Sequence, residues 1–408
     1  MTAPAIAPNL QHATDLRVVG LVSTAHFISH VYILVLPPLF PFVRAEFAVS
    51  YTELGVAIAI FNILTAILQT PAGFLVDRTS ARAVLVGGLI LGAGSLAAAA
   101  FATSFYAFVA MFAFTGIANS VYHPANYALL SGRVSPPRMS HAYSVHIFAG
   151  FMGTAIAPAS LVFLAALFGW RGAFVAAALL GVAIAAAMLL FGEPLAGRTR
   201  MSASEEEPGK PDWHVLLSAP VLRNLVFFIL LAVTGAGLQN YGIVALEALW
   251  GTSLSLATTA LSVYLLMSAF AVLVGGVLSA RTERHHLVAI AGLAVSALAL
   301  IPIAVFDLGA PALLALMALS GFCTGVIMPS RDMLVRAVTP PGAFGKVFGF
   351  VTTGFNIGGI VAPPLFGFLM DGGSPQWVLL GSALCAIASI PLVMAVAWRA
   401  PFFDRKHD

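Results

Sequence analysis

Charged side chains are scarce in this sequence. Asp, Glu, Lys and Arg together make up 9% of its 408 residues, whereas a soluble domain carries roughly 25%. So few charges cannot cover a water-facing surface of this size, which excludes an ordinary soluble globular protein. The formal net charge of +3 is no sign of nucleic-acid binding, because the basic residues follow a membrane topology instead.

Cysteine is also rare. Both cysteines, Cys323 and Cys385, lie in apolar runs, so neither a disulfide nor a cysteine metal site is predicted. The sequence has no glycine-rich phosphate loop with a lysine, which argues against ATP as the energy source, and no hydrolase-like group of residues. We therefore expect no enzymatic activity, no cofactor and no bound metal. Residues 1–16 lack the features of a signal peptide and are expected to form a short, disordered cytoplasmic tail.

Long apolar runs dominate the rest of the chain. Hydrophobic residues make up 60% of it, and the charges lie between runs of roughly 20 residues or more, which is long enough to cross hydrocarbon. We expect an all-α membrane protein with twelve transmembrane helices, near 17–43, 52–76, 83–103, 105–130, 139–167, 171–192, 221–248, 254–279, 286–306, 310–335, 343–370 and 376–399.

The basic residues predict the orientation. With a cytoplasmic N-terminus, all of the 19 lysines and arginines fall on the cytoplasmic side except Arg44, Arg171 and Arg331, which places both termini inside the cell. The one long polar stretch, 193–220, contains three consecutive glutamates and is expected to be a cytoplasmic linker. It separates a six-helix bundle at 17–192 from another at 221–399, and residues 400–408 form a second tail.

The two predicted bundles are related by an internal repeat with an offset of 203 to 205 residues. The matched pairs are Gly73 with Gly276, Arg78 with Arg281, Gly116 with Gly321, Pro124 with Pro329, Gly150 with Gly354 and Pro158 with Pro363. Each bundle has an even number of spans, so both insert in the same orientation. The repeat is therefore parallel, about an axis along the membrane normal, which is typical of secondary transporters.

A short basic stretch, Gly73–Arg82, lies between two apolar runs and is interpreted as a tight loop that recurs at Gly276–Arg284. The Asp77 carboxylate can pair with a basic residue of the other bundle or cap a helix N-terminus. We expect these loops to act in gating through Gly73, Asp77, Arg78, Arg82 and Arg281. The alternative is that the arginines only fix the topology.

These residues resemble the major facilitator superfamily over nearly the whole chain. Gly73–Arg82 is similar to the signature between its helices 2 and 3, although Ser80 replaces a glycine, and Gly169-Trp-Arg-Gly172 is similar to its start of helix 6. The stretch Gly116–Pro124, with the His26 region, resembles the fosmidomycin-resistance drug exporters within it. The resemblance implies alternating access and proton-coupled export, or antiport, of a drug across a bacterial inner membrane. Ala125 stands where that group usually carries an acidic residue, and Ser29 and His30 stand where it tends to carry a carboxylate.

Four histidines fall well inside predicted spans, whereas His141, His285 and His286 lie at helix ends and are expected to be ordinary loop residues. His26 and His30 share a helix face because they are four residues apart. His26, His123 and His146 each lie about eight to ten residues from a cytoplasmic helix end, which is roughly 12–15 Å of rise. Ionisable groups at this depth rarely face lipid. They could relay a proton, bond a substrate or, least favoured, bind a metal; the alternative is a structural bond to a neighbouring helix.

Arg331 and Asp332 lie within one span, after Pro329. Arginine stays protonated and binds carboxylate or phosphate with two parallel bonds, so Arg331 is a candidate anchor for an anion. Asp332 is the only carboxylate well inside any predicted span and is a candidate to carry a coupling proton. Consecutive helical residues point about 100° apart, so these two need not pair with each other. The alternative is a pairing with other helices that locks the cytoplasmic side.

Gln239 and Asn240 follow Gly235 and Gly237 in the outer half of a span and are interpreted as an interruption of a cavity-lining helix. The expected substrate-binding residues are thus His26, His30, His123, Asn126, Gln239, Asn240 and Arg331, and those for proton coupling are Asp332 and His123.

The predicted function is a monomeric secondary active transporter of a small, anionic solute or drug that uses protons and lies in the lipid bilayer. Proton-coupled uptake, or symport, of an organic acid is the first alternative. A transporter-like sensor without net transport is a remote one.

Overall fold

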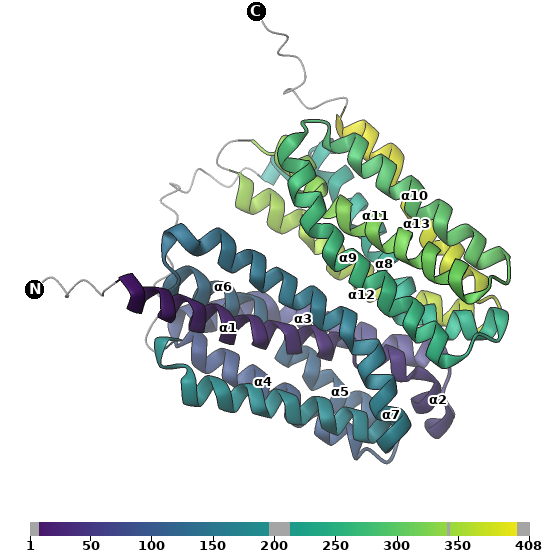
Figure 1. The fold of residues 1–408 in the computed structure, drawn as a ribbon, viewed down its shortest axis with the longest axis horizontal. Helices are drawn as coiled ribbons and strands as arrows, with labels where there is room; N and C mark the ends of the chain where they lie inside the picture. The colour runs from purple at the N-terminus through teal and green to yellow at the C-terminus, as the bar shows by residue number, and fades with distance from the viewer. Residues whose placement is uncertain (1–7, 196–212, 341–342, 398–408) are drawn as a thin grey trace, which may run out of the picture. The chain divides into compact units, whose positions relative to one another are not determined.

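The structure is a computed structural model that describes residues 8–195, 213–340 and 343–397, and in these ranges every regular element is a helix (Figure 1). Residues 1–7, most of the predicted linker and the tail at 400–408 lie outside the described residues. Helices satisfy their own backbone hydrogen bonds, which is what a chain in hydrocarbon requires.

The first compact unit comprises residues 1–47 and 60–203. Helices α1 and α4 both lie alongside α7, and α5 packs against α4 (Figure 1). Its elements are α1 (Pro8–Ile33), η1 (Pro37–Leu39), α2 (Phe40–Phe47), the later part of α3 (Tyr51–Arg78), α4 (Ala81–Ala100), α5 (Phe105–Asn119), α6 (Tyr122–Arg133), η2 (Pro136–Arg138), α7 (Met139–Phe191) and η3 (Glu193–Leu195).

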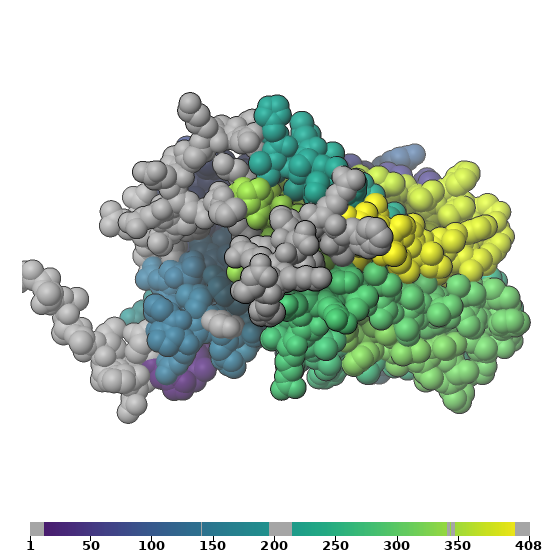
Figure 2. Space-filling model, turned by 90° about the horizontal axis from the view of Figure 1, so that it is seen from above, coloured from purple at the N-terminus to yellow at the C-terminus, as the bar shows by residue number. Residues whose placement is uncertain are grey.

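The second compact unit comprises residues 48–59, which begin α3, and 204–408. Helix α8 packs against α12 and α13, and α11 packs against α9 and α10; the yellow α13 lies beside the green helices of this unit in Figure 2. Its further elements are η4 (Trp213–Val215), α8 (Ala219–Trp250), α9 (Leu254–Arg281), α10 (His285–Val305), α11 (Ala310–Ala337), α12 (Phe344–Asp371) and α13 (Gln376–Ala397).

The described residues contain 11 helical segments that are long and apolar enough to cross a membrane. Their ends agree with the apolar runs to within a few residues at most positions. The predicted spans 139–167 and 171–192 fall in one segment, His141–Phe191, of 51 residues. The predicted number of twelve is therefore not confirmed, although this segment is about twice as long as a single crossing needs.

The long helix α7 is bent at Gly169. The backbone there has φ 70° and ψ 167°, outside the helical region, and a side chain would be strained at this φ. The two following residues fasten the bend to α2: Trp170 Nε1 donates to Glu46 Oε2 at 2.5 Å, and Arg171 Nη2 donates to Glu46 Oε1 at 2.5 Å. Arg171 also donates to the carbonyl oxygen of Ala102, beyond the end of α4, at 2.9 Å.

The loop predicted over Gly73–Arg82 was largely wrong. Helix α3 continues through Gly73 to Arg78, because the apolar pattern runs on through these residues, and only Thr79 and Ser80 connect it to α4. Ser80 is the N-cap of α4, where its Oγ accepts from the Ala83 amide at 3.4 Å. The second copy behaves in the same way, since α9 runs to Arg281.

The predicted tail over residues 1–16 was also wrong for its second half. Helix α1 begins at Pro8, and Asp15 within it is only 1% exposed. Its carboxylate accepts from Ser135 Oγ at 2.5 Å and from Arg138 Nη1 at 3.0 Å. The start of α1 is thus fixed to the connection between α6 and α7, a contact between distant residues that no local pattern reveals.

Matched glycines make the same helix contact in each unit. A Cβ on Gly116 of α5 would collide with the backbone of Phe61 in α3, and one on Gly321 of α11 would collide with the backbone of Tyr264 in α9. Small residues let membrane helices approach this closely. The predicted repeat therefore extends to the packing of backbone on backbone within each unit.

The first turn of α3 is held by the last residue of α12, within the second unit. Asp371 Oδ1 accepts from the Tyr51 amide at 2.9 Å, and Oδ2 accepts from the Thr52 amide at 2.8 Å and from Thr52 Oγ1 at 2.6 Å. The Tyr241 hydroxyl lies 2.7 Å from the carbonyl oxygen of Pro363. A carboxylate at a helix start satisfies free N–H groups and complements the helix dipole.

Replacing Asp371 with alanine should therefore lower the apparent melting temperature of the purified protein. Loss of a side-chain cap costs about 0.5–2 kcal/mol. Asp371→Asn should retain part of the stability, because an amide oxygen still accepts. Asp307→Ala is the matched control, since Asp307 is exposed in the loop after α10. Equal melting temperatures for Asp371→Ala and Asp307→Ala would contradict the capping role.

Candidate functional site

Four histidine rings from three helices gather inside the first unit. His26 on α1 is the centre: its ring centroid lies 4.6 Å from that of His30, 5.3 Å from that of His123 on α6, and 4.0 Å from that of His146 on α7. His26 and His146 are stacked, whereas the other two rings meet His26 edge to face. We call these four residues the histidine cluster.

The sequence explains why the three helices can present these rings. Pro124 has no N–H to donate within a helix, and the helix is interrupted at Ser120 and Val121, between the end of α5 and the start of α6 at Tyr122. The break places His123 in the first turn of α6. On α7, Gly150 removes the side chain that would otherwise meet Nε2 of both His26 and His30.

Most ring nitrogens of the buried histidines have no hydrogen-bond partner among the described residues. His26 is 4% exposed and His146 is 0% exposed. Nδ1 of His26 and both ring nitrogens of His146 are buried without a partner, whereas His30 Nδ1 lies 2.8 Å from Thr154 Oγ1. A buried polar atom left unpaired costs about 1–3 kcal/mol. Such atoms in a cluster suggest that a proton, a water molecule or a ligand completes the site.

The cluster contains four imidazoles and no carboxylate. The titratable groups that act electrostatically on His26 and His30 are the other imidazoles of the cluster. Within the described ranges, no group of three or more histidine, cysteine or acidic residues has a geometry that could hold a metal ion. The chemistry left to four imidazoles is proton binding and hydrogen bonding to a polar solute.

Asn126 lies on α6, three residues after His123, and is 0% exposed. A spacing of three places both side chains on one side of the helix. Neither polar atom of the Asn126 amide has a hydrogen-bond partner in the described part of the chain. The structure thus places three of the predicted substrate residues, His26, His30 and His123, in one cluster, with Asn126 one turn away.

Arg331 lies on α11 in the second unit and is largely enclosed. Its Nε donates to Asp332 Oδ1 at 2.9 Å, and its Nη2 lies 2.7 Å from the same oxygen. The guanidinium carbon lies 4.8 Å from the ring centroid of Phe228 on α8 and 5.1 Å from that of Phe355 on α12. Although the two residues need not pair on geometric grounds, the flexible arginine side chain bends back to its neighbour.

Arg331, Asp332, Phe228 and Phe355 form a second group, which we call the Arg331 cluster. It is the repeat counterpart of the histidine cluster. Gly150 faces the side chain of His26, and its match Gly354 faces the Cβ of Phe228. Asn126 in α6 corresponds by the repeat to Arg331 in α11. Equivalent places in the two units thus hold a group of imidazoles in the first and an arginine against two phenyl rings in the second.

The predicted interruption at Gln239 and Asn240 was wrong. Helix α8 is continuous from Ala219 to Trp250, because a polar pair within a long apolar run does not by itself break a helix. Both side chains are partly exposed. They belong to the second unit and are not part of the histidine cluster.

The residues assigned to gating lie at helix ends. Asp77 and Arg78 are exposed in the last turn of α3, and Asp77 forms no ion pair with another described residue. Arg82 has a structural contact, since its Nη2 donates to the carbonyl oxygens of Met188 and Leu189 at 2.9 and 2.8 Å. It caps the end of α7, where the helix dipole favours a cation. Arg281 is exposed at the end of α9.

Thr154 of α7 was not considered from the sequence, and His146 was weighed with the other histidines but was not among the expected site residues. His146 and Thr154 lie four residues before and after Gly150, so the three form a stripe on one face of α7. That stripe faces the pair His26 and His30, which has the same spacing. The spacing of four around a repeated glycine was the signal that could have revealed them.

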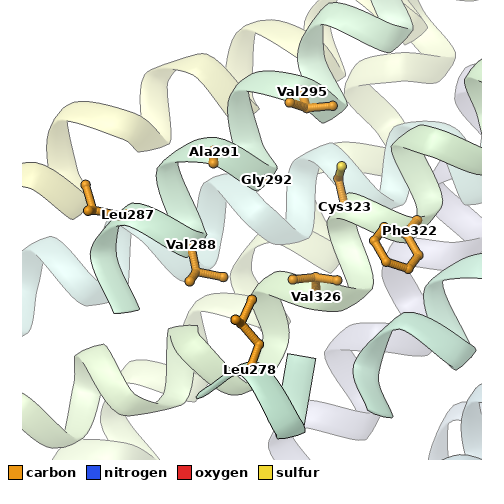
Figure 3. A pocket seen from close by; sticks show the side chains of 9 residues that line it. All are labelled: Leu278, Leu287, Val288, Ala291, Gly292, Val295, Phe322, Cys323 and Val326. Carbon is orange, nitrogen blue, oxygen red and sulfur yellow. The ribbon is translucent and has the colours of Figure 1, made fainter. Parts of the chain in front are cut away.

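The second unit also carries an apolar groove between α9, α10 and α11, with a volume of about 400 Å³ (Figure 3). Its lining consists of Leu278, Leu287, Val288, Ala291, Gly292, Val295, Phe322, Cys323 and Val326. Apart from the Cys323 thiol, these side chains offer no polar group. The groove therefore does not provide the polar anchors that fix the orientation of a charged solute.

The Major Facilitator Superfamily model matches this chain in two segments, residues 22–249 and 225–407. The chain belongs to the major facilitator superfamily. It is accordingly a multi-pass membrane protein that transports small molecules and is not an enzyme. This agrees with the helical fold and with the resemblance inferred from Gly73–Arg82.

Curated relatives support the narrower resemblance. The fosmidomycin resistance protein of Escherichia coli is 23% identical over 414 residues, which covers 99% of this chain and 97% of the relative. The transporter YfnC of Bacillus subtilis, whose function is uncharacterised, is 23% identical over 390 residues, 93% of this chain and 92% of its own. The predicted similarity to the fosmidomycin-resistance group is confirmed.

Solved structures share the fold at low identity. A bacterial homologue of the human lysosomal transporter Spinster, in an inward-facing and occupied conformation, has a TM-score of 0.79 at 15% identity and covers 99% of this chain and 100% of its own. A point mutant of the nucleoside transporter NupG has a TM-score of 0.75 at 16% identity and covers 94% of this chain and 99% of its own. These likenesses establish the arrangement of helices alone.

Replacing Arg331 with alanine should destabilise the protein more than replacing Arg336, which is exposed on the same helix. Two cation–π contacts and an ion pair are lost, which amounts to about 1–3 kcal/mol. The measurement is the apparent melting temperature in detergent. Arg331→Ala combined with Asp332→Ala should cost less than the sum of the single changes, because the pair is coupled. Strict additivity would mean that the pair contributes nothing.

Proposed function

We propose that this protein is a proton-coupled secondary transporter that exports a small organic solute or drug. In this proposal twelve helices cross a bacterial inner membrane, both termini lie in the cytoplasm, and the protein works as a monomer by alternating access. Export is supported by the similarity to the fosmidomycin resistance protein over 99% of this chain.

The observation that carries proton coupling is the histidine cluster. Three buried ring nitrogens of His26 and His146 have no partner among the described residues, and histidine binds and releases protons near physiological pH. The acidic residues expected from the resemblance are replaced by Ala125 and, in α1, by Ser29 and His30. Imidazoles therefore take the place of carboxylates as the groups that bind the proton.

A specific observation also supports the alternative of symport of an organic acid. Asp332 neutralises Arg331 through the bonds at 2.9 and 2.7 Å. A proton on Asp332 would release the guanidinium, which could then bind a carboxylate with two parallel bonds. Proton and anion would then bind together rather than compete. A probable L-galactonate transporter of Escherichia coli, 26% identical over 35% of this chain, is a relative named for an organic acid.

Everted membrane vesicles with an acidic interior distinguish the two directions. Export by antiport should accumulate radiolabelled fosmidomycin inside the vesicles, and collapse of the pH gradient should abolish the accumulation. Symport should instead drive preloaded L-galactonate out of the vesicles. If no pH gradient changes either flux, proton coupling is refuted, and the remote alternative of a sensor gains support.

His123→Asn should lower the gradient-driven flux by about tenfold or more, since loss of about 1.4 kcal/mol of interaction is tenfold. Asparagine keeps hydrogen bonding but cannot bind a proton at neutral pH. His141→Asn is the matched control, because His141 is exposed at the start of α7. A full gradient-driven flux in His123→Asn would exclude His123 from the coupling step.

A further inference from the structure

The hydroxyl of Thr154 lies within hydrogen-bond distance of both His30 Nδ1 and the carbonyl oxygen of Gly150. Thr154 Oγ1 donates to the carbonyl oxygen of Gly150, one turn earlier on α7, at 3.3 Å; this is a common bond of threonine in helices. A hydroxyl has one hydrogen, so while Thr154 donates it to Gly150 it can only accept from His30. His30 Nδ1, 2.8 Å away, is then the N–H donor.

When His30 Nδ1 donates to Thr154 and Thr154 donates to Gly150, Nε2 of neutral His30 carries no proton. Nε2 of His30 and Nε2 of His26 converge over Gly150: a Cβ on that glycine would lie 2.9 Å from the first and 2.6 Å from the second. The space over Gly150 is thus bordered by two ring nitrogens from one helix, with a fixed lone pair on one of them.

Three further titratable side chains lie near His26 and His30. His146 of α7 stacks on His26, and His123 of α6 meets its edge. The ring centroid of Tyr127 lies 6.2 Å from that of His123 and 5.8 Å from that of His146. A proton entering the space over Gly150 therefore meets imidazoles and a phenol.

We propose that Thr154 is a positioning residue of the proton site: it holds His30 in the Nδ1–H tautomer, so that an incoming proton binds Nε2 of His30 and is shared with Nε2 of His26 over Gly150. The step forms one N–H bond at Nε2 of His30 and breaks one O–H bond of the hydronium ion that delivers the proton, which leaves as water. It rests on the proton-coupled function proposed above and identifies the atoms that accept the proton.

The tautomer can be measured without any transport. The full-length protein, labelled with ¹⁵N-histidine and reconstituted in lipid nanodiscs, gives ring-nitrogen chemical shifts that distinguish protonated from bare nitrogen. The His30 signals are assigned by their loss in His30→Gln. We expect His30 to carry its proton on Nδ1 in the wild type and in Thr154→Ser, which keeps the hydroxyl.

In Thr154→Val, a variant of the same shape without the hydroxyl, the Nδ1–H to Nε2–H ratio should fall about tenfold, the equivalent of one hydrogen bond. Thr154→Ala provides the same test if the valine variant does not fold. A wild-type His30 that carries its proton on Nε2, or a ratio that is unchanged in both variants, would overturn the proposal.

A second measurement separates this inference from the transport function. The pH at which half of His30 is protonated, followed by the same signals, should shift in Thr154→Val and stay unchanged in Thr154→Ser. If these shifts occur while no flux responds to a pH gradient, the proton site is supported and the proposed coupling fails. If flux depends on pH but the His30 signals do not titrate between pH 5 and 9, coupling is supported and the His26–His30 site is refuted.

Discussion

The structure depends on one constraint: a chain with 9% charged residues must keep its few polar side chains away from hydrocarbon. Lipid offers no hydrogen bonds, so such groups survive only inside helical bundles or against one another. Each unit satisfies the constraint in its own way. The first encloses the four imidazoles of the histidine cluster, and the second places the charge of Arg331 against Asp332 and beside the rings of Phe228 and Phe355.

The internal repeat conserves backbone contacts while the chemistry of the two units diverges. Gly116 and Gly321 let pairs of helices approach in the same way, and Gly150 and Gly354 face equivalent places on α1 and α8. At those places one unit has His26 and the other has Phe228. Gly150 and Gly354 have no side chain, so they leave room for either an imidazole or a phenyl ring on the facing helix. The repeat therefore accounts for the shared helix packing, and the side chains at these places account for the different chemistry of the two units.

Much of the fold could be predicted from the sequence, since long apolar runs such as 254–279 and 310–335 indicate helices that lie in hydrocarbon. The His26 and His30 pair could also be predicted, because a spacing of four fixes one helix face. The partners across helices could not: the contacts of Asp15 with Arg138 and of His30 with Thr154 join residues more than a hundred positions apart. The helical state of Gly73–Arg78 was missed because charged residues at a helix end resemble a loop in sequence.

The charge balance of the two clusters also determines how the membrane potential can act. Unprotonated imidazoles carry no charge, and Arg331 and Asp332 cancel, so these groups add no net charge to the empty protein. Each elementary charge that crosses 100 mV exchanges about 2.3 kcal/mol with the electric field. In the proposed proton-coupled cycle, the voltage would therefore act at these two clusters through the cargo. A proton that accompanies a monovalent anion would move no net charge, whereas a proton exchanged for that anion would move two charges per cycle. The electrical signature of the cycle would therefore reveal its stoichiometry.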